Sequence, residues 1–121
     1  MTDHEGATKR AHYDSIEFDD QLALVEGRPF TGTVFATHPD GRTSAEYAYV
    51  EGLPDGLQLE WYPNGQLESR SVAIRGKGSS EVTYWYENGQ MKSQRFDKDG
   101  WPAEVKEWDP DGKLVRHAKY K

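Results

Sequence analysis

Apolar and polar residues alternate over short stretches of this chain, and turns rich in glycine separate the stretches. Leu57, Leu59 and Trp61 alternate with other side chains from residue 57 to residue 62. Alternation with a period of two places every second side chain on the same face of a strand. Short strands at intervals of about 8–12 residues, with no sustained helical stripe between them, predict an all-β fold.

One turn is repeated four times along the chain. Its copies are His38-Pro39-Asp40-Gly41, Tyr62-Pro63-Asn64-Gly65, Tyr86-Glu87-Asn88-Gly89 and Asp109-Pro110-Asp111-Gly112, so the turn glycines are almost evenly spaced. Proline at the first central position, Asn or Asp next and glycine last match a three-residue hairpin loop that ends in a left-handed residue. Each repeat is therefore expected to be one β-hairpin.

A second set of glycines follows the same period at the opposite ends of the hairpins. Its members are Gly27, Gly52, Gly76 and Gly100. Stacked units of roughly 23–25 residues are typical of repeat architectures. The two sets together predict one antiparallel meander of about eight to nine strands in an elongated, twisted sheet. We expect it to occupy residues 13–121 and to follow a flexible tail at residues 1–12.

Large side chains flank the repeated turn at fixed distances. The residues four positions before its glycine are Thr37, Trp61, Trp85 and Trp108, and those two positions after it are Thr43, Leu67, Met91 and Leu114. Around a three-residue loop these positions lie opposite each other, so cross-strand aromatic–aliphatic pairs are expected. The first and last units diverge from the two central ones, as terminal repeats often do.

Composition is consistent with a thin sheet rather than a thick core. Apolar residues make up 35% of the 121 residues and the mean hydropathy is −0.95, yet the chain has four Trp, seven Tyr and four Phe. Aromatic residues argue against disorder. The chain has no Cys, which excludes thiol nucleophiles and Cys-based zinc sites. No secretory signal or membrane span is recognisable, so a cytoplasmic location is expected.

Charge is distributed unevenly between the two halves of the chain. Residues 1–60 hold 12 acidic and 4 basic side chains, a balance of −8, whereas residues 61–121 hold 9 acidic and 11 basic ones, a balance of +2. An acidic surface repels nucleic acid and attracts a basic protein. We therefore expect no nucleic-acid partner and no stable insertion into a membrane.

The two central repeats carry a family resemblance. Trp61-Tyr-Pro-Asn-Gly-Gln-Leu67 and Trp85-Tyr-Glu-Asn-Gly-Gln-Met91 resemble the MORN-variant repeat of YwqK-type proteins, and Trp108-Asp-Pro-Asp-Gly-Lys-Leu114 is similar in degenerate form. The resemblance extends over roughly residues 19–120. It implies an antitoxin or immunity protein that neutralises a cognate toxin by direct binding, or else a repeat scaffold that binds proteins or membrane surfaces. It implies no catalytic residue.

No residue pattern for catalysis, metal binding or cofactor binding stands out. The four histidines lack the HxH or HExxH spacing of a metal site, and no serine lies in a G-x-S-x-G motif. Gly76-Lys77-Gly78-Ser79 lacks the glycine spacing and the following helix of a phosphate loop, so it is expected to be a turn. We therefore expect a protein that is not an enzyme and has no cofactor.

Candidate partner-binding residues are those that break the repeat. An acidic run in the first half is either a solvated edge or a binding surface for a basic toxin, of which a nuclease would be one example. Several tyrosines occupy positions where the other repeats have non-aromatic residues, and exposed tyrosines are favourable interface anchors. The candidates are Asp14, Glu17, Asp19, Asp20, Tyr47, Tyr49, Tyr62, Tyr84 and Tyr86.

Overall fold

The computed structural model describes residues 9–75 and 77–120, which form two β-sheets. The main sheet has nine strands in the order β1-β5-β6-β7-β8-β9-β10-β11-β12, and the small sheet has the order β2-β3-β4. The strands are β1 (Arg10–His12), β2 (Glu17–Asp19), β3 (Leu22–Val25), β4 (Arg28–Pro29), β5 (Gly32–Thr37), β6 (Thr43–Val50), β7 (Leu53–Trp61), β8 (Leu67–Ile74), β9 (Gly78–Trp85), β10 (Met91–Lys98), β11 (Trp101–Trp108) and β12 (Leu114–Lys119). One turn of 3-10 helix, η2 (Tyr13–Ser15), follows β1.

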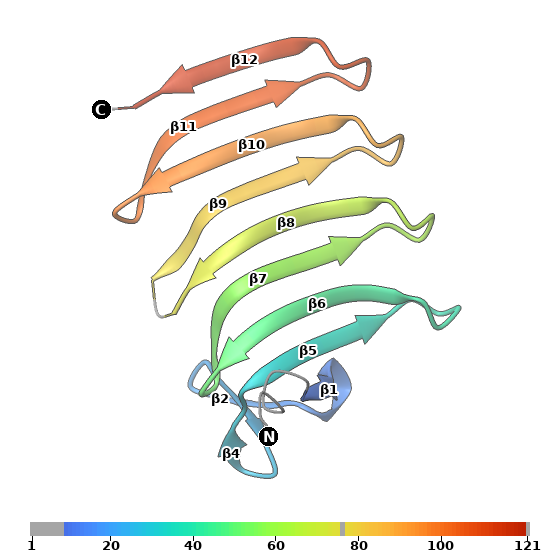
Figure 1. Ribbon diagram of the computed structural model, residues 1–121, viewed down its shortest axis with the longest axis vertical. Helices are drawn as coiled ribbons and strands as arrows, with labels where there is room; N and C mark the ends of the chain where they lie inside the picture. The colour runs from blue at the N-terminus through green and yellow to red at the C-terminus, as the bar shows by residue number, and fades with distance from the viewer. Residues whose placement is uncertain (1–8, 76, 121) are drawn as a thin grey trace, which may run out of the picture.

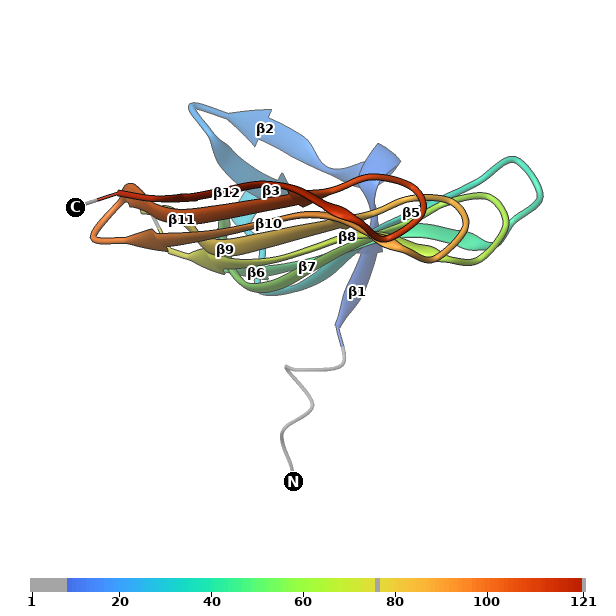
Figure 2. The same ribbon diagram turned by 90° about the horizontal axis from the view of Figure 1, so that it is seen from above.

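The predicted meander is confirmed from β5 to β12. Each of these eight strands pairs antiparallel with the next one along the chain. Figure 1 shows them as the rungs of a ladder that ends at β12, and Figure 2 shows that the rungs form a single twisted layer. The described residues place no other element on the sheet from β8 to β12. Both faces are therefore accessible over most of its length.

The N-terminal end departs from a simple meander. β1 pairs parallel with β5, although an all-antiparallel sheet was expected. Ala11 lies opposite the fully buried Val34, and the Arg10 guanidinium lies 4.7 Å from the centre of the Phe35 ring. These contacts hold the end of the expected tail, from Arg10 to His12, against the sheet. Residues 1–8 of that tail lie outside the described residues.

The small sheet lies over one face of the main sheet at this end (Figure 2). Backbone hydrogen bonds tie it to the turn between β6 and β7. Ala23 N donates to Gly52 O at 2.8 Å, and Gly52 N donates to Phe30 O at 2.8 Å. Ala23 and Phe30 are buried in the contact. These hydrogen bonds and buried side chains therefore pack the small sheet directly against the main sheet.

The two faces of the main sheet carry different side chains. Residues directly opposite each other in neighbouring strands share a face, so the strand register assigns each side chain. The bulky face carries Phe35, Leu57, Leu59, Trp61, Val72, Trp85, Phe96 and Trp108. The small-residue face carries Val34, Ala45, Glu60, Ser69, Ser71, Ala73, Val82 and Ser93, with Tyr47, Tyr49 and Tyr84 among them. The alternation predicted in the second repeat is confirmed.

The predicted positions lie opposite each other in all four hairpins, and three of the four pairs are aromatic–aliphatic. Trp61 lies opposite Leu67, and Trp85 lies opposite Met91. The divergent hairpins have Thr37 opposite Thr43 and Trp108 opposite Leu114. Fully enclosed side chains are few and mostly small, as the lean composition predicts; the buried ones are Ala23, Phe30, Val34, Ala45, Ala73, Ser69 and Thr83.

The repeated turn has the predicted three-residue loop. Gly65 N donates to Tyr62 O at 2.9 Å and Tyr62 N donates to Gln66 O at 2.9 Å, so residues 63–65 form the loop. Gly65 has φ of 90°, in the left-handed region that favours glycine. The other three turns repeat these bonds. At the opposite ends of the hairpins, Gly52 and Gly100 also have positive φ, and Gly76 lies outside the described residues.

Side chains of the repeated turns bind the backbone of the next turn. The Tyr62 hydroxyl donates to Trp85 O at 2.6 Å, and the Tyr86 hydroxyl donates to Trp108 O at 2.9 Å. His38 Nε2 makes the equivalent contact with Trp61 O at 3.0 Å. We call this stack of four loops, centred on Gly41, Gly65, Gly89 and Gly112, the turn ladder. It couples each hairpin to its neighbour beyond the strand pairing itself.

The third residue of the two central turns makes a second contact in the turn ladder. Asn64 Oδ1 accepts a hydrogen bond from Gln66 N at 2.9 Å, while its Nδ2 donates to Glu87 O at 3.0 Å. Asn88 does the same toward Pro110 O at 3.0 Å. The first turn has Asp40 here, which has no N–H to donate. Arg42 replaces that donor and its Nη2 binds Pro63 O at 2.8 Å.

Candidate protein-interaction surface

The four acidic candidates lie together at the N-terminal end of the molecule. Asp14 is in η2, Glu17 and Asp19 are on β2, and Asp20 is in the turn that follows β2. All four are exposed. Asp20 and Gln21 have φ of 51° and 76°, since this tight reversal joins two short strands without glycine. The sequence run thus becomes one acidic surface around the outer strand of the small sheet.

An exposed aromatic pair belongs to the same segment as these acidic residues. The ring centres of Tyr13 and Phe18 are 5.8 Å apart, and the two residues are 47% and 49% exposed. Phe18 stands on the side of β2 opposite to Glu17 and Asp19, because successive side chains of a strand alternate. Every residue of β2 is exposed, so both sides of the strand are accessible. We define the aromatic–acidic patch as Tyr13, Asp14, Glu17, Phe18, Asp19 and Asp20.

The acidic side chains of this patch are largely free of intramolecular ion pairs. Asp14 Oδ2 lies 3.6 Å from His12 Nδ1. Within residues 9–75 and 77–120, no Lys, Arg or His nitrogen lies within ion-pair distance of the Glu17, Asp19 or Asp20 carboxylates. Glu60 and Glu46, in contrast, are engaged by neighbouring side chains. A partner that covers β2 therefore meets exposed aromatic side chains on one side of the strand and the Glu17 and Asp19 carboxylates on the other.

Tyr47 and Tyr49 lie beside this patch on the small-residue face. The Tyr47 hydroxyl donates to Glu60 Oε2 at 2.5 Å, and the Ser69 hydroxyl donates to Glu60 Oε1 at 3.0 Å. Burial, followed by the hydrogen bond to Glu60, raises the pKa of Tyr47 well above its ordinary value. Burial also raises the pKa of Tyr49, and the nearby Tyr13 acts in the same direction on both residues. Both tyrosines therefore lie near Tyr13 of the patch.

The other tyrosine candidates lie away from the patch. Tyr62 and Tyr86 belong to the turn ladder, where each hydroxyl is bound to a backbone carbonyl, so their variation between repeats has a structural explanation. Tyr84 stands 46% exposed on the small-residue face, opposite Ser69. The structure thus brings Tyr47 and Tyr49 close to Tyr13 of the patch and leaves Tyr62, Tyr84 and Tyr86 elsewhere.

Sequence reasoning missed the aromatic centre of the patch. Tyr13 and Phe18 are adjacent to the acidic candidates in the chain, and that proximity was the available signal. Their contact depends on how η2 turns the chain between β1 and β2. His12 Nδ1 accepts a hydrogen bond from Asp14 N at 3.1 Å and caps this turn. The sequence alone did not reveal this local arrangement.

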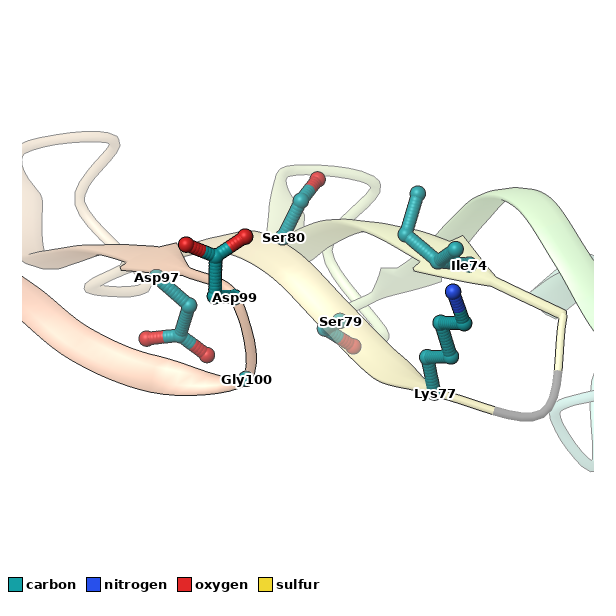
Figure 3. Close-up of a pocket in the computed structure, with 7 residues that line it drawn as sticks. All are labelled: Ile74, Lys77, Ser79, Ser80, Asp97, Asp99 and Gly100. Carbon is teal, nitrogen blue, oxygen red and sulfur yellow. The ribbon is translucent and has the colours of Figure 1, made fainter.

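A second surface feature is an open groove of about 590 Å³ between the β8–β9 and β10–β11 turns. Figure 3 shows Lys77 on one side of β9 and the carboxylates of Asp97 and Asp99 on the other. Asp97 Oδ1 accepts a hydrogen bond from Arg95 Nε at 3.0 Å. The two carboxylates thus lie together, apart from Lys77 (Figure 3). No group of three metal-binding side chains is found among the described residues.

The hairpins match a known repeat family. The family described as MORN repeat variant matches residues 54–72, 80–99 and 101–121, and the matches correspond to the β7–β8, β9–β10 and β11–β12 hairpins. The chain carries three MORN-variant repeats. The first hairpin, β5–β6, has the same turn geometry but lies outside the matched residues, so the match is shorter than the expected span of 19–120. Nothing in the match assigns the chain to the YwqK-type group.

Other comparisons add no relative to this family match. No curated protein and no solved structure shows a significant similarity to the chain. MORN repeats are typical of scaffolds for interactions with proteins or membranes. In residues 9–75 and 77–120, no helix has the length and apolar character needed to cross a bilayer.

Proposed function

We propose that this MORN-variant repeat protein is a cytoplasmic immunity protein or antitoxin, which neutralises a cognate bacterial toxin by direct binding. The aromatic–acidic patch is the observation that carries this proposal. In protein interfaces a few desolvated aromatic residues supply most of the affinity, and charged residues around them steer association. The patch has this composition: Tyr13 and Phe18 form an exposed aromatic pair, and four exposed carboxylates belong to neighbouring residues of the same segment.

The expected partner is a basic protein. Within residues 9–75 and 77–120, only Asp14 of the patch has a basic side chain at ion-pair distance, and the N-terminal half, residues 1–60, has a charge balance of −8. Complementary charge raises the association rate and suppresses wrong partners. A nuclease toxin is one example of a basic partner, because it needs a basic surface to bind its nucleic-acid substrate. Binding that covers such a surface would neutralise the toxin without any catalytic step in this chain.

Co-expression of the chain with the toxin encoded beside it tests the proposal. Protection of the host and co-purification of the two proteins are expected. The variant Phe18→Ala should weaken the complex at least tenfold, because truncation of a central aromatic residue costs about 2 kcal/mol or more. Unchanged toxicity together with no co-purification would contradict the proposal.

A matched pair of charge-reversal variants separates the patch from net charge. Glu17→Lys with Asp19→Lys changes the patch, and Glu87→Lys with Asp111→Lys makes the same change of charge at exposed positions in the turn ladder. Only the first pair should slow association. If both pairs slow association equally, overall charge and not the patch directs binding.

The family match by itself supports a broader alternative, a repeat scaffold for protein or membrane-surface interactions. Binding to anionic vesicles that weakens with added salt would favour the membrane form of this alternative. The net charge of −6 opposes attraction to anionic lipids. If the alternative is a scaffold for other proteins, the same aromatic–acidic patch would be the binding surface. The partner would then be a protein other than a toxin.

A further inference from the structure

His12 caps the short turn that carries the chain from β1 to β2. Its Nδ1 accepts a hydrogen bond from Asp14 N at 3.1 Å, and its Nε2 lies 3.4 Å from Thr37 Oγ1. A neutral imidazole has one donor nitrogen and one acceptor nitrogen. Because the backbone N–H of Asp14 can only donate, Nδ1 is the acceptor, and the hydrogen-bond pattern assigns the proton of neutral His12 to Nε2.

Protonation of His12 removes this acceptor. Both ring nitrogens of an imidazolium are donors, so the Nδ1–H and the backbone N–H of Asp14 would point at each other. The carboxylate of Asp14 offers the ring a replacement, since its Oδ2 lies 3.6 Å from Nδ1. An added proton therefore exchanges a backbone contact of Asp14 for a side-chain contact of the same residue, and η2 loses its cap.

The cap is one of a small number of bonds that hold η2 in place. Within the described residues, Ile16 N donates to Tyr13 O at 3.1 Å, and the Ser15 hydroxyl donates to His12 O at 2.7 Å. A single helical turn is costly to form and has no further turn to compensate for a lost bond. Tyr13 is the first residue of η2, and its ring centre lies 5.8 Å from that of Phe18. The cap therefore stabilises the aromatic pair of the patch.

The charged groups around His12 come from three elements. Arg10 precedes it on β1, and its guanidinium carbon lies 4.7 Å from the centre of the Phe35 ring, which the His12 ring meets edge-on at 5.1 Å. Glu46 on β6 binds Arg10 at 3.1 Å, and Asp14 belongs to η2. The side chains of β5 that the ring contacts are uncharged. A proton on His12 is thus repelled by Arg10, whose charge Glu46 offsets, and attracted by the Asp14 carboxylate.

We infer that His12 is a pH-sensitive cap, which holds Tyr13 next to Phe18 at neutral pH and releases it in acid. Histidine is the side chain whose charge ordinarily changes between about pH 5 and pH 8, and the His12 side chain is 36% exposed, so protons reach it. Release lowers the fraction of molecules with an intact aromatic–acidic patch, and apparent affinity falls with that fraction. This effect on binding rests on the proposed function, whereas the structural change does not.

Nuclear magnetic resonance of the full chain between about pH 8 and pH 5 tests the cap without a partner. The ring nitrogen shifts of neutral His12 should place its proton on Nε2. As the ring titrates, the Asp14 amide should shift with the same midpoint, in the direction of a lost hydrogen bond. The loss of one hydrogen bond changes such an equilibrium about fivefold, so the nuclear Overhauser effects between the Tyr13 and Phe18 rings should fall by at least half.

Two variants separate the cap from the charge. Asparagine is a preferred cap that does not titrate, and in His12→Asn the side-chain oxygen stands the same number of bonds from the backbone as Nδ1. The Asp14 amide and the ring contact should then be independent of pH over the same range. In His12→Ala the cap is absent, so the contact should be weak at every pH. Circular dichroism of both variants reports whether the sheet is retained.

The same variants extend the test to binding. The affinity of the parent chain for the co-expressed toxin should fall about fivefold between neutral and acidic pH, and that of His12→Asn should change less than about twofold. This comparison isolates the cap, because both proteins carry the same carboxylates and the same toxin titrates in each mixture. Equal losses in the two proteins would overturn the inference.

The inference is also wrong if neutral His12 carries its proton on Nδ1, or if the Asp14 amide and the ring contact stay constant while His12 titrates. An equal response to acid in His12→Asn would assign the change to carboxyl groups instead. The resonance measurements do not involve the toxin, so their failure leaves the proposed function unaffected. A chain that shows the expected resonance changes but binds the toxin at no pH would contradict the proposed function alone.

Discussion

The turn ladder gives a sharp prediction at Asn64. The substitution Asn64→Asp keeps the shape of the side chain and its acceptor for Gln66 N, which lies 2.9 Å from Asn64 Oδ1. It removes the donor that binds Glu87 O at 3.0 Å and places a carboxylate oxygen next to that carbonyl oxygen. We expect the variant to be less stable, because one inter-repeat hydrogen bond becomes a repulsive contact.

The expected loss follows from the exposure of the site. A hydrogen bond of this kind contributes about 1 kcal/mol net, and the exposed position of Asn64 allows water to compensate in part for the repulsion. We expect the free energy of unfolding to fall by about 1–1.5 kcal/mol. For a domain of this size that corresponds to a decrease in Tm of roughly 3–6 °C.

The first repeat shows how the loss can be reversed. Asp40 occupies the position equivalent to Asn64, and Arg42, two residues later, supplies the missing donor to Pro63 O at 2.8 Å. Arg42 Nε also binds Asp40 Oδ2 at 2.9 Å. The side chains of Arg42 and Gln66 both approach the glycine of the following turn. The double variant Asn64→Asp with Gln66→Arg should therefore regain at least half of the lost stability.

A double-mutant cycle on the free energy of unfolding in urea measures this rescue. The control Gln66→Arg alone should change stability little, since Asn64 already occupies the acceptor. A coupling free energy of about 0.5–1 kcal/mol in favour of the double variant is expected. Additive effects of the two substitutions, or an Asn64→Asp variant as stable as the parent, would refute the role assigned to the turn ladder.

The remaining predictions concern the tyrosines and one turn glycine. Tyr62→Phe should lower the free energy of unfolding by about 1 kcal/mol, because it removes the 2.6 Å bond to the next turn, whereas Tyr84→Phe, at an exposed side chain, should have almost no effect in the same urea titration. Gly65→Val should destabilise its hairpin by more than about 1 kcal/mol, since a β-branched residue resists a φ of 90°; an unchanged melting curve would remove the turn assignment. Burial and the Glu60 hydrogen bond raise the pKa of Tyr47, so the folded state retains this proton while the unfolded state loses it, and stability should decrease as pH rises above about 10. Tyr47→Phe should remove this part of the alkaline loss, and Glu60→Gln should lower the pKa of Tyr47 in an ultraviolet titration.

The aromatic–acidic patch was only partly predictable. Its carboxylates are visible as a run in the sequence, and their exposure follows from their polarity. Tyr13 and Phe18 gave no periodic signal, and their contact across 5.8 Å depends on the short η2 turn. Tyr62 and Tyr86 were selected as interface candidates because they vary between repeats, yet their hydroxyl groups bind the adjacent hairpin. Variation at a repeat position can reflect alternative ways to make the same structural contact.

The sequence alone determined the hairpins of this protein. Gly65 and its equivalents adopt positive φ, and Pro63 restricts the type of turn. The alternation around Trp61 determines which side chains share a face of the sheet. All three constraints act within a few residues of the chain. Tertiary structure alone decided the parallel pairing of β1 with β5 and the position of the small sheet over the main one. These features depend on contacts between residues far apart in the chain, such as Ala11 with Val34 and Ala23 with Gly52. A repeat period specifies each unit and its neighbour, but it carries no information about how the non-repeating N-terminal segment packs against the first hairpin.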